Sequence, residues 1–297
     1  MHYAVTSRIL GLLLMIFSVT HLPPMLLGVH DGDDTWRSFV WSFAITLVTG
    51  TLIWFPNREA HGELRVRDGY LITALFWFVL GAFGAIPFLL GERPAMDAAD
   101  ALFEAFSGLS TTGATVLTGL DELPRSILYY RQQLQWLGGM GIVVLAVAVM
   151  PMLGIGGMQL YRAEMPGPLK DNKLSPRIAD TAKTLWLIYC GLTALCALAY
   201  WLAGMTPFDA IGHSFATIAI GGFSTHDASI AFFDSALIEA ICIFFMAASG
   251  MNFALHFLAL RSRSLKAYLR DPECMTYLRL LAAVFVITTA LLLVYSH

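Results

Sequence analysis

Charged side chains are scarce in this sequence. They make up 13% of its 297 residues, against about a quarter in an average soluble protein. Hydrophobic residues make up 57%, and the mean hydropathy is +0.68. This composition is far too apolar for an ordinary soluble domain, so the chain is predicted to lie in a lipid bilayer, and nucleic acid is not an expected partner.

Motifs of common catalytic sites are also missing. The sequence has no HExxH, GxxxxGK[ST] or CxxC, and no GxGxxG after a strand, so zinc proteases, P-loop enzymes and dinucleotide-binding enzymes lack a local signature. Its four cysteines lie in or beside apolar segments at irregular spacing and are interpreted as small buried residues. An intramembrane hydrolase using Ser224 and His256 is a remote alternative without a nucleophile motif. An enzyme is therefore not expected.

Apolar segments of ~20 residues, the length that crosses ~30 Å of hydrocarbon, recur along the chain. Each is expected to be helical, because lipid offers no partner to backbone N–H and C=O groups. The first segment contains Pro23 and Pro24 and leads directly into the second, which argues against a cleavable signal peptide. The seven predicted spans are Val5–Val29, Trp36–Phe55, Tyr70–Leu90, Ile127–Leu153, Thr184–Gly204, Ser235–Leu260 and Met275–Val294.

Most cationic residues are expected on one side of the membrane. By the positive-inside rule that side is the cytoplasm, and the N-terminus lies there. The opposite loops are acidic, and this either concentrates cations or reflects only the scarcity of Lys and Arg; both interpretations stay open. The residues expected inside are Arg8, Arg58, Arg65, Arg67, Arg162, Lys170, Lys173, Arg177, Lys183, Arg261, Arg263, Lys266, Arg270 and Arg279, and those expected outside are Arg37, Arg93, Arg125 and Arg131.

Two short segments repeat one pattern at a constant offset of 109 residues. In the first, the helical pattern of Asp97–Leu109 reaches only about 20 Å at 1.5 Å per residue, so the chain must turn back inside the membrane. The turn is predicted at Ser110–Thr115, and in the second copy Phe208–Thr217 enters and Ile218–Ser224 returns. The segments are Ala101–Thr115 and Ala210–Ser224, and the aligned pairs include Phe106 with Phe215, Gly113 with Gly222 and Thr115 with Ser224.

The chemistry of such a turn favours a cation. Backbone that is not helical at this depth has carbonyl oxygens without partners, which is tolerated where protein buries it or where water and ions line it. Carbonyl oxygens can replace the hydration shell of a cation, and glycine allows the positive φ that turns them toward one axis. The C-terminal end of the short helix adds partial negative charge. The repeat therefore predicts an ion conduction path.

Three runs in the sequence resemble the TrkH potassium-uptake proteins of the Trk/Ktr/HKT superfamily: Phe106–Thr115, Gln135–Gly141 and Ile218–Thr225. The resemblance extends from near the N-terminus to the last residue. It implies a K⁺-selective, channel-like subunit, homodimeric and multi-pass in the bacterial inner membrane. It also implies gating by a cytoplasmic, nucleotide-binding ring of TrkA type, and no organic cofactor on this chain.

In this family, backbone oxygens beside one glycine per loop coordinate K⁺. A serine at the position of Gly113 is linked to Na⁺ transport in some plant relatives, so glycine resembles the K⁺-selective members. The resemblance assigns the K⁺-binding carbonyls to Thr111, Thr112 and Gly113 and to Ile220, Gly221 and Gly222, flanked by Ser110, Ala114, Ala219 and Phe223.

The expected fold is an all-α integral membrane protein built from helix–pore loop–helix units. The family has four such units, and this sequence contains two, so the chain is interpreted as a partial TrkH-type subunit. A non-conducting scaffold or assembly subunit is the alternative. The predicted organisation is two leading helices in residues 1–68, one unit with a cytoplasmic loop in 69–180, a second unit in 181–270, and the first helix of an incomplete third in 271–297.

Polar residues near the loops have expected roles as well. Glu104 and His213 match at the 109-residue offset, and structural support of the loops is favoured over direct ion contact. Asp100 and Asp209 are predicted to be N-terminal caps or dipole partners of the two short helices. The cluster Gly138–Gly141 is expected to let its helix pack closely against a pore loop, with a gating hinge as the alternative.

Overall fold

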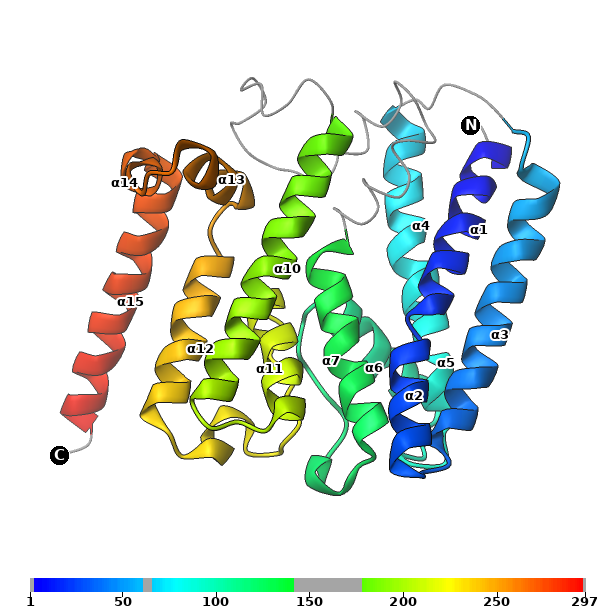
Figure 1. Cartoon of the computed structure of the whole chain (residues 1–297), viewed down its shortest axis with the longest axis horizontal. Coiled ribbons are helices and arrows are strands. Elements are labelled where there is room, and N and C mark those ends of the chain that lie inside the picture. Colours follow the sequence, from blue (N-terminus) through cyan, green and yellow to red (C-terminus); the bar gives the residue numbers. More distant parts are fainter. Residues whose placement is uncertain (1–2, 61–65, 142–177, 296–297) are drawn as a thin grey trace. The chain divides into compact units, whose positions relative to one another are not determined.

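The computed structural model describes residues 3–60, 66–141 and 178–295. Within these residues every regular element is a helix, which confirms the expected all-α class (Figure 1). The chain divides into two compact units, Met1–Met246 and Ala247–His297. The predicted division into four segments stays a prediction.

The first unit holds two leading helices, two short helices that precede the predicted loops, and the longer helices around them. Its elements are α1 (Tyr3–Val19), α2 (Leu22–Asp31), α3 (Thr35–Trp54), η1 (Phe55–Asn57), α4 (Val66–Gly84), α5 (Ile86–Leu90), α6 (Ala98–Leu109), η2 (Leu120–Glu122), α7 (Arg125–Gly139), α10 (Ile178–Leu202), α11 (Pro207–Ala219), η5 (Ser229–Phe233) and most of α12 (Ala236–Ser249).

The second unit contains three further helices, α13 (Phe253–Ser262), α14 (Lys266–Arg270) and α15 (Pro272–Tyr295). Asn252 caps α13, because its side chain accepts a hydrogen bond from the Ala254 N–H at 3.0 Å. The Tyr277 hydroxyl of α15 donates to the Ala247 carbonyl at 3.3 Å.

Several described helices are long and apolar enough to cross a membrane. There are five such spans, or six if the broken pair α12 and α13 counts as one. The predicted span Ile127–Leu153 begins on α7, but its second half lies outside the described residues, as do Arg162, Lys170 and Lys173 of the predicted cytoplasmic loop. The count of seven therefore stays a prediction. The five are Tyr3–Asp31, Thr35–Asn57, Tyr70–Leu90, Lys183–Leu202 and Pro272–Tyr295.

The leading helices α1 and α3 meet through glycine. A Cβ placed on Gly11 would lie 2.7 Å from the Gly50 carbonyl oxygen, and one placed on Gly50 would lie 2.8 Å from the Gly11 carbonyl oxygen. Small residues at this crossing let the two backbones touch, which is a common way to associate helices in lipid.

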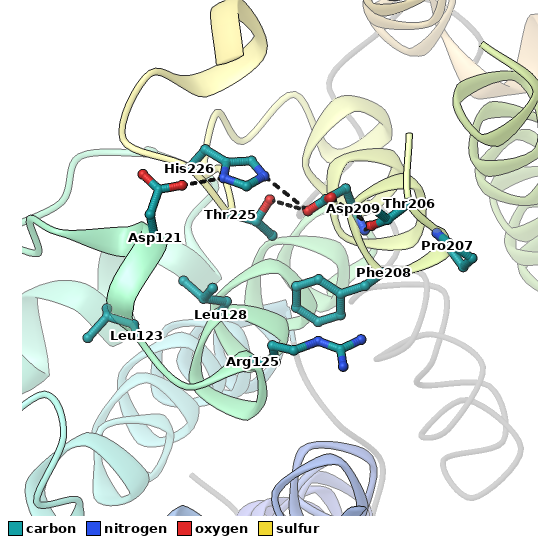
Figure 2. A pocket seen from close by; sticks show the side chains of 10 residues that line it. All are labelled: Asp121, Leu123, Arg125, Leu128, Thr206, Pro207, Phe208, Asp209, Thr225 and His226. Atoms are coloured by element: carbon teal, nitrogen blue, oxygen red, sulfur yellow. Dashed lines mark hydrogen bonds and ion pairs between the residues drawn. The ribbon is translucent and has the colours of Figure 1, made fainter. Parts of the chain in front are cut away.

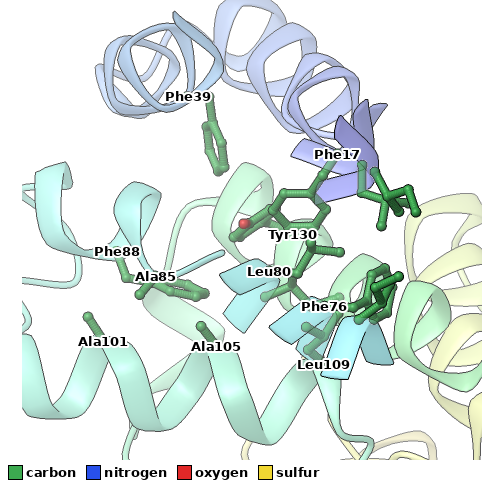
Figure 3. Packing of buried hydrophobic residues seen from close by; sticks show 14 of the residues in the cluster. Phe17, Phe39, Phe76, Leu80, Ala85, Phe88, Ala101, Ala105, Leu109 and Tyr130 are labelled. Carbon is green, nitrogen blue, oxygen red and sulfur yellow. The ribbon is translucent and has the colours of Figure 1, made fainter. Parts of the chain in front are cut away.

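Tyr130 of α7 lies at the centre of the apolar core (Figure 3). It is fully buried, and its ring packs against Phe39 at 5.3 Å and Phe88 at 5.4 Å between centroids. Its hydroxyl donates to the Gly84 carbonyl at 2.9 Å, so the polar tip is satisfied inside the core. Tyr130 thereby fixes α7 against α3, α4 and α5, and α7 in turn supports the predicted loops.

Candidate functional site

The two short helices, α6 and α11, begin with equivalent caps. The Asp97 side chain accepts a hydrogen bond from the Asp100 N–H at 2.8 Å, and the Thr206 side chain accepts one from the Asp209 N–H at 3.1 Å. The caps keep the 109-residue offset. Of the two roles predicted for Asp100 and Asp209, cap or dipole partner, the structure supports the second: both lie in the first turn, where an acidic side chain complements the helix dipole, and Asp97 and Thr206 are the caps.

The two helices also end in the same way. Thr111 and Ile220 follow the last helical turns with left-handed φ values of 56° and 53°. One residue later, the Thr112 N–H bonds the Ser107 carbonyl at 2.9 Å, and the Gly221 N–H bonds the Ala216 carbonyl at 2.8 Å. These bonds form a Schellman motif in each copy. A β-branched residue is rarely left-handed, and such conformations persist only where surrounding contacts impose them.

Beyond these turns, the two loops approach each other closely. Gly113 and Gly222 again have matching positive φ values, 76° and 86°. A Cβ placed on Gly113 would lie 1.9 Å from the Gly221 carbonyl oxygen, so the two backbones are in contact. Among residues 3–60, 66–141 and 178–295, none donates a hydrogen bond to the carbonyl oxygens of the six predicted K⁺-binding residues. Their role in ion binding stays a prediction.

The four flanking residues have structural contacts. Ser110 is the C-cap of α6, and the Ala114 carbonyl accepts a hydrogen bond from the Ser107 hydroxyl at 2.5 Å. The Phe223 N–H donates to Gln135 Oε1 at 3.0 Å. Ala219 is the last residue of α11, so the prediction that the second copy turns back at Ile218 is wrong by two residues.

Glu104 and His213 support the loops at equivalent places. Glu104 accepts hydrogen bonds from the Thr115 hydroxyl at 2.9 and 3.0 Å and from the Val116 N–H at 3.2 Å. His213 Nε2 lies 3.0 Å from the Ser224 hydroxyl. Thr115 and Ser224 are themselves equivalent in the repeat, so a side chain of each short helix forms a hydrogen bond with the loop segment that follows that helix. These contacts fit the structural role that was favoured from the sequence.

Arg131 of α7 contacts both loops, a role that the sequence analysis did not predict. Its side chain is 1% exposed and pairs with Glu104, which is fully buried, at 2.7 Å. Its predicted place on the outer side of the membrane stays a prediction. A charge inside a predicted span is itself a sign of a special role, and that signal could have identified it.

The glycines of α7 receive the ends of the two short helices, as expected for close packing. A Cβ on Gly138 would lie 1.8 Å from the Leu109 carbonyl oxygen at the end of α6. A Cβ on Gly139 would lie 3.0 Å from the Cα of Ala219 at the end of α11. Adjacent glycines thus hold both helix ends against α7, which favours the packing role over a hinge.

A pocket of about 420 Å³ lies beside the loops (Figure 2). His226 stands between two carboxylates in it: Nδ1 lies 2.5 Å from Asp121, and Nε2 lies 3.3 Å from Asp209 without hydrogen-bond geometry. The Leu120 N–H also donates to Asp227 at 3.0 Å. These contacts join the segments that follow the first and second loops, and residue type alone did not reveal them.

Asp121 should make this connection sensitive to acid. The hydrogen bond with His226 is the main cause that holds the Asp121 pKa below its usual value of 3.8. A lowered carboxyl pKa stabilises the folded state above the usual pKa, and this contribution is lost as the pH falls through the lowered value. Asp121→Asn should therefore lower the melting temperature near neutral pH and flatten its fall as the pH drops through and below the usual carboxyl pKa.

The measurement is thermal unfolding of the purified chain across that pH range. Glu122→Gln, which removes a neighbouring carboxylate, is the matched control and should keep the wild-type pH dependence. If Asp121→Asn also keeps it, the contact with His226 does not stabilise the segments that follow the two loops.

Comparison with known proteins identifies relatives over nearly the whole chain. The family model TrkH, described as cation transport protein, matches residues 36–296. The Trk system potassium uptake protein TrkH of Halomonas elongata is 61% identical over 282 residues, which are 95% of this chain and 58% of the relative. The protein of the same name from Escherichia coli K12 is 59% identical over 292 residues, 98% of this chain and 60% of the relative.

A solved structure agrees with these matches. The crystal structure of the potassium transporter TrkH from Vibrio parahaemolyticus superposes with a TM-score of 0.86 at 52% identity, covering 99% of this chain and 60% of that one. The present chain thus spans about 60% of the length of the proteins that it matches.

Proposed function

Since the chain belongs to the TrkH family of cation transport proteins, we propose that it forms part of a path for K⁺ across the bacterial inner membrane. The observation that carries this proposal is the pair of equivalent loops, with left-handed residues at Thr111 and Ile220 and at Gly113 and Gly222. If carbonyl oxygens from both loops bind one ion, the two loops need matching backbone conformations. The proposed role is transport rather than catalysis.

In the proposed filter, backbone carbonyls bind the ion in place of water. Thr111, Thr112 and Gly113 supply one strand, and Ile220, Gly221 and Gly222 supply the other. The C-terminal ends of α6 and α11 lead into these strands, so the helix dipoles favour a cation there. No organic cofactor is needed for this chemistry.

The membrane setting follows from the same proposal. We place the N-terminus in the cytoplasm, so that K⁺ enters from the side of the acidic loops with a driving force of ~2.3 kcal/mol per 100 mV of membrane potential. A homodimer and a regulatory nucleotide-binding ring of TrkA type on the cytoplasmic side complete the proposed assembly.

Growth of a K⁺-uptake-deficient bacterial strain at limiting K⁺ tests the proposal. Expression of the full chain should rescue growth, and Gly113→Ser and Gly222→Asp should each remove the rescue, because they add side chains at positive φ inside the proposed filter. Immunoblots of membranes should show comparable amounts of each protein.

The other outcomes are decisive too. Rescue that both substitutions leave intact would defeat the assignment of the filter. Absence of rescue by wild-type protein that is present in the membrane would favour the non-conducting scaffold instead.

A further inference from the structure

One guanidinium group contacts both filter loops. Arg131 Nη2 donates to the Thr115 hydroxyl of the first loop at 3.0 Å, and Nη1 donates to the Ser224 carbonyl of the second at 3.2 Å. Nε donates to Glu104 at 2.7 Å. The guanidinium carbon also lies 4.3 Å from the ring centre of Phe223. A single buried side chain therefore links strands whose sequence positions are about a hundred residues apart.

This link stands outside the internal repeat. After the loops the two copies align at an offset of 111 residues, with Gly139-Met140 matching Gly250-Met251, so the residue equivalent to Arg131 in the second copy is Cys242. The equivalent of Glu104 is His213. His213 bonds its own strand through the Ser224 hydroxyl with no cationic partner on α12. Support of one loop thus needs no arginine, so the distinctive property of Arg131 is that it reaches across to the other loop.

A contribution to folding stability alone does not account for the buried ion pair of Arg131 and Glu104. Desolvating two charges offsets much of their attraction, and apolar residues of similar size often hold a core equally well. The guanidinium group, however, is planar and its N–H donors point in fixed directions, so one arginine side chain sets the positions of several hydrogen-bond acceptors at once.

We propose that Arg131, oriented by Glu104, is a positioning residue that sets the separation of the two filter loops and thereby the preference for K⁺ over Na⁺. The inference rests on the proposed filter. Gly113 and the Gly221 carbonyl are already in contact, so the two loops cannot move closer together. A shift of the segment around Ser224 therefore changes the spacing of the carbonyl oxygens. Glu104 also neutralises the arginine, which would otherwise repel a cation nearby.

Cation-dependent unfolding of the purified full chain tests this proposal. Melting temperatures are measured in rising KCl and NaCl, and the concentration giving half of the maximal stabilisation is compared for the two salts. Wild-type protein should respond to less K⁺ than Na⁺. Arg131→Lys keeps the positive charge but removes the planar set of N–H donors. The ratio of the half-stabilising Na⁺ concentration to the half-stabilising K⁺ concentration should therefore fall by about tenfold, equivalent to about 1.4 kcal/mol.

Two further variants complete the test. Glu104→Gln leaves the guanidinium without a counter-charge, so it should weaken the response to both salts. Arg37→Lys changes an exposed arginine on α3 and should keep the wild-type ratio.

The outcomes separate this inference from the proposed function. A wild-type ratio in Arg131→Lys would overturn the positioning role while leaving the filter intact, and a wild-type response of Glu104→Gln to both salts would overturn the role given to Glu104. Failure of both variants to unfold cooperatively would assign the pair to stability alone and would likewise overturn it. A wild-type chain that responds equally to K⁺ and Na⁺ would instead refute the filter.

Discussion

Alanine in place of Gly113 should abolish K⁺-dependent growth of cells that rely on this chain, whereas alanine in place of Gly222 should only reduce it. Both positions have positive φ, which costs an L-residue about 1–2 kcal/mol. Only the Cβ at position 113 meets backbone, at 1.9 Å from the Gly221 carbonyl oxygen; a Cβ on Gly222 has nothing within 4 Å. The Gly113→Ala protein must therefore displace a carbonyl that we propose as a K⁺ ligand.

Gly222→Ala is the matched control for Gly113→Ala, because each substitution adds one methyl group at an equivalent position of the repeat. Growth at limiting K⁺ is the measurement, normalised to the amount of protein in the membrane. Equal loss in both variants would show that strain at positive φ dominates. Full growth of Gly113→Ala would mean that the two loops do not approach as closely as the structure places them.

The loops could be predicted because their pattern occurs twice. A short apolar helix followed by glycine has few distinctive residues, but the constant offset of 109 residues makes the match specific. The structure extends that match to backbone conformation at Thr111 and Ile220. The end of α11 was harder to locate, because the left-handed residue there is isoleucine and not the glycine that commonly marks a helix end.

Arg131 was missed for the opposite reason. The matching position in the second copy holds an uncharged residue, so comparison of the repeats contains no signal for it. Counting charges by side of the membrane assigned it only to the outer side and gave it no role. The contact between Asp121 and His226 is equally hard to predict, since these residues are separated by 105 positions and meet only after both copies of the repeat fold. Local patterns predict the elements, whereas contacts between the two copies require the tertiary structure.

Gly138→Ala should prevent stable folding of the first unit. A Cβ there would lie 1.8 Å from the carbonyl oxygen and 2.7 Å from the carbonyl carbon of Leu109. Because these are backbone atoms of α6, no side-chain rotation relieves the overlap, and α7 must move away from the helix that leads into the first loop. Overpacking of a core typically costs 1–3 kcal/mol, and contact with rigid backbone places this change at or above about 3 kcal/mol.

Gly191→Ala on α10 is the matched control for this change. It adds the same methyl group within a helix, but nothing lies within 4 Å of it. Alanine favours a helix over glycine by up to about 1 kcal/mol, so the control should melt at or above the wild-type temperature. Thermal unfolding of the purified proteins distinguishes the two. A Gly138→Ala protein that melts like the control would show that α7 and α6 have room between them, and the support of the first loop by α7 would then have to be rejected.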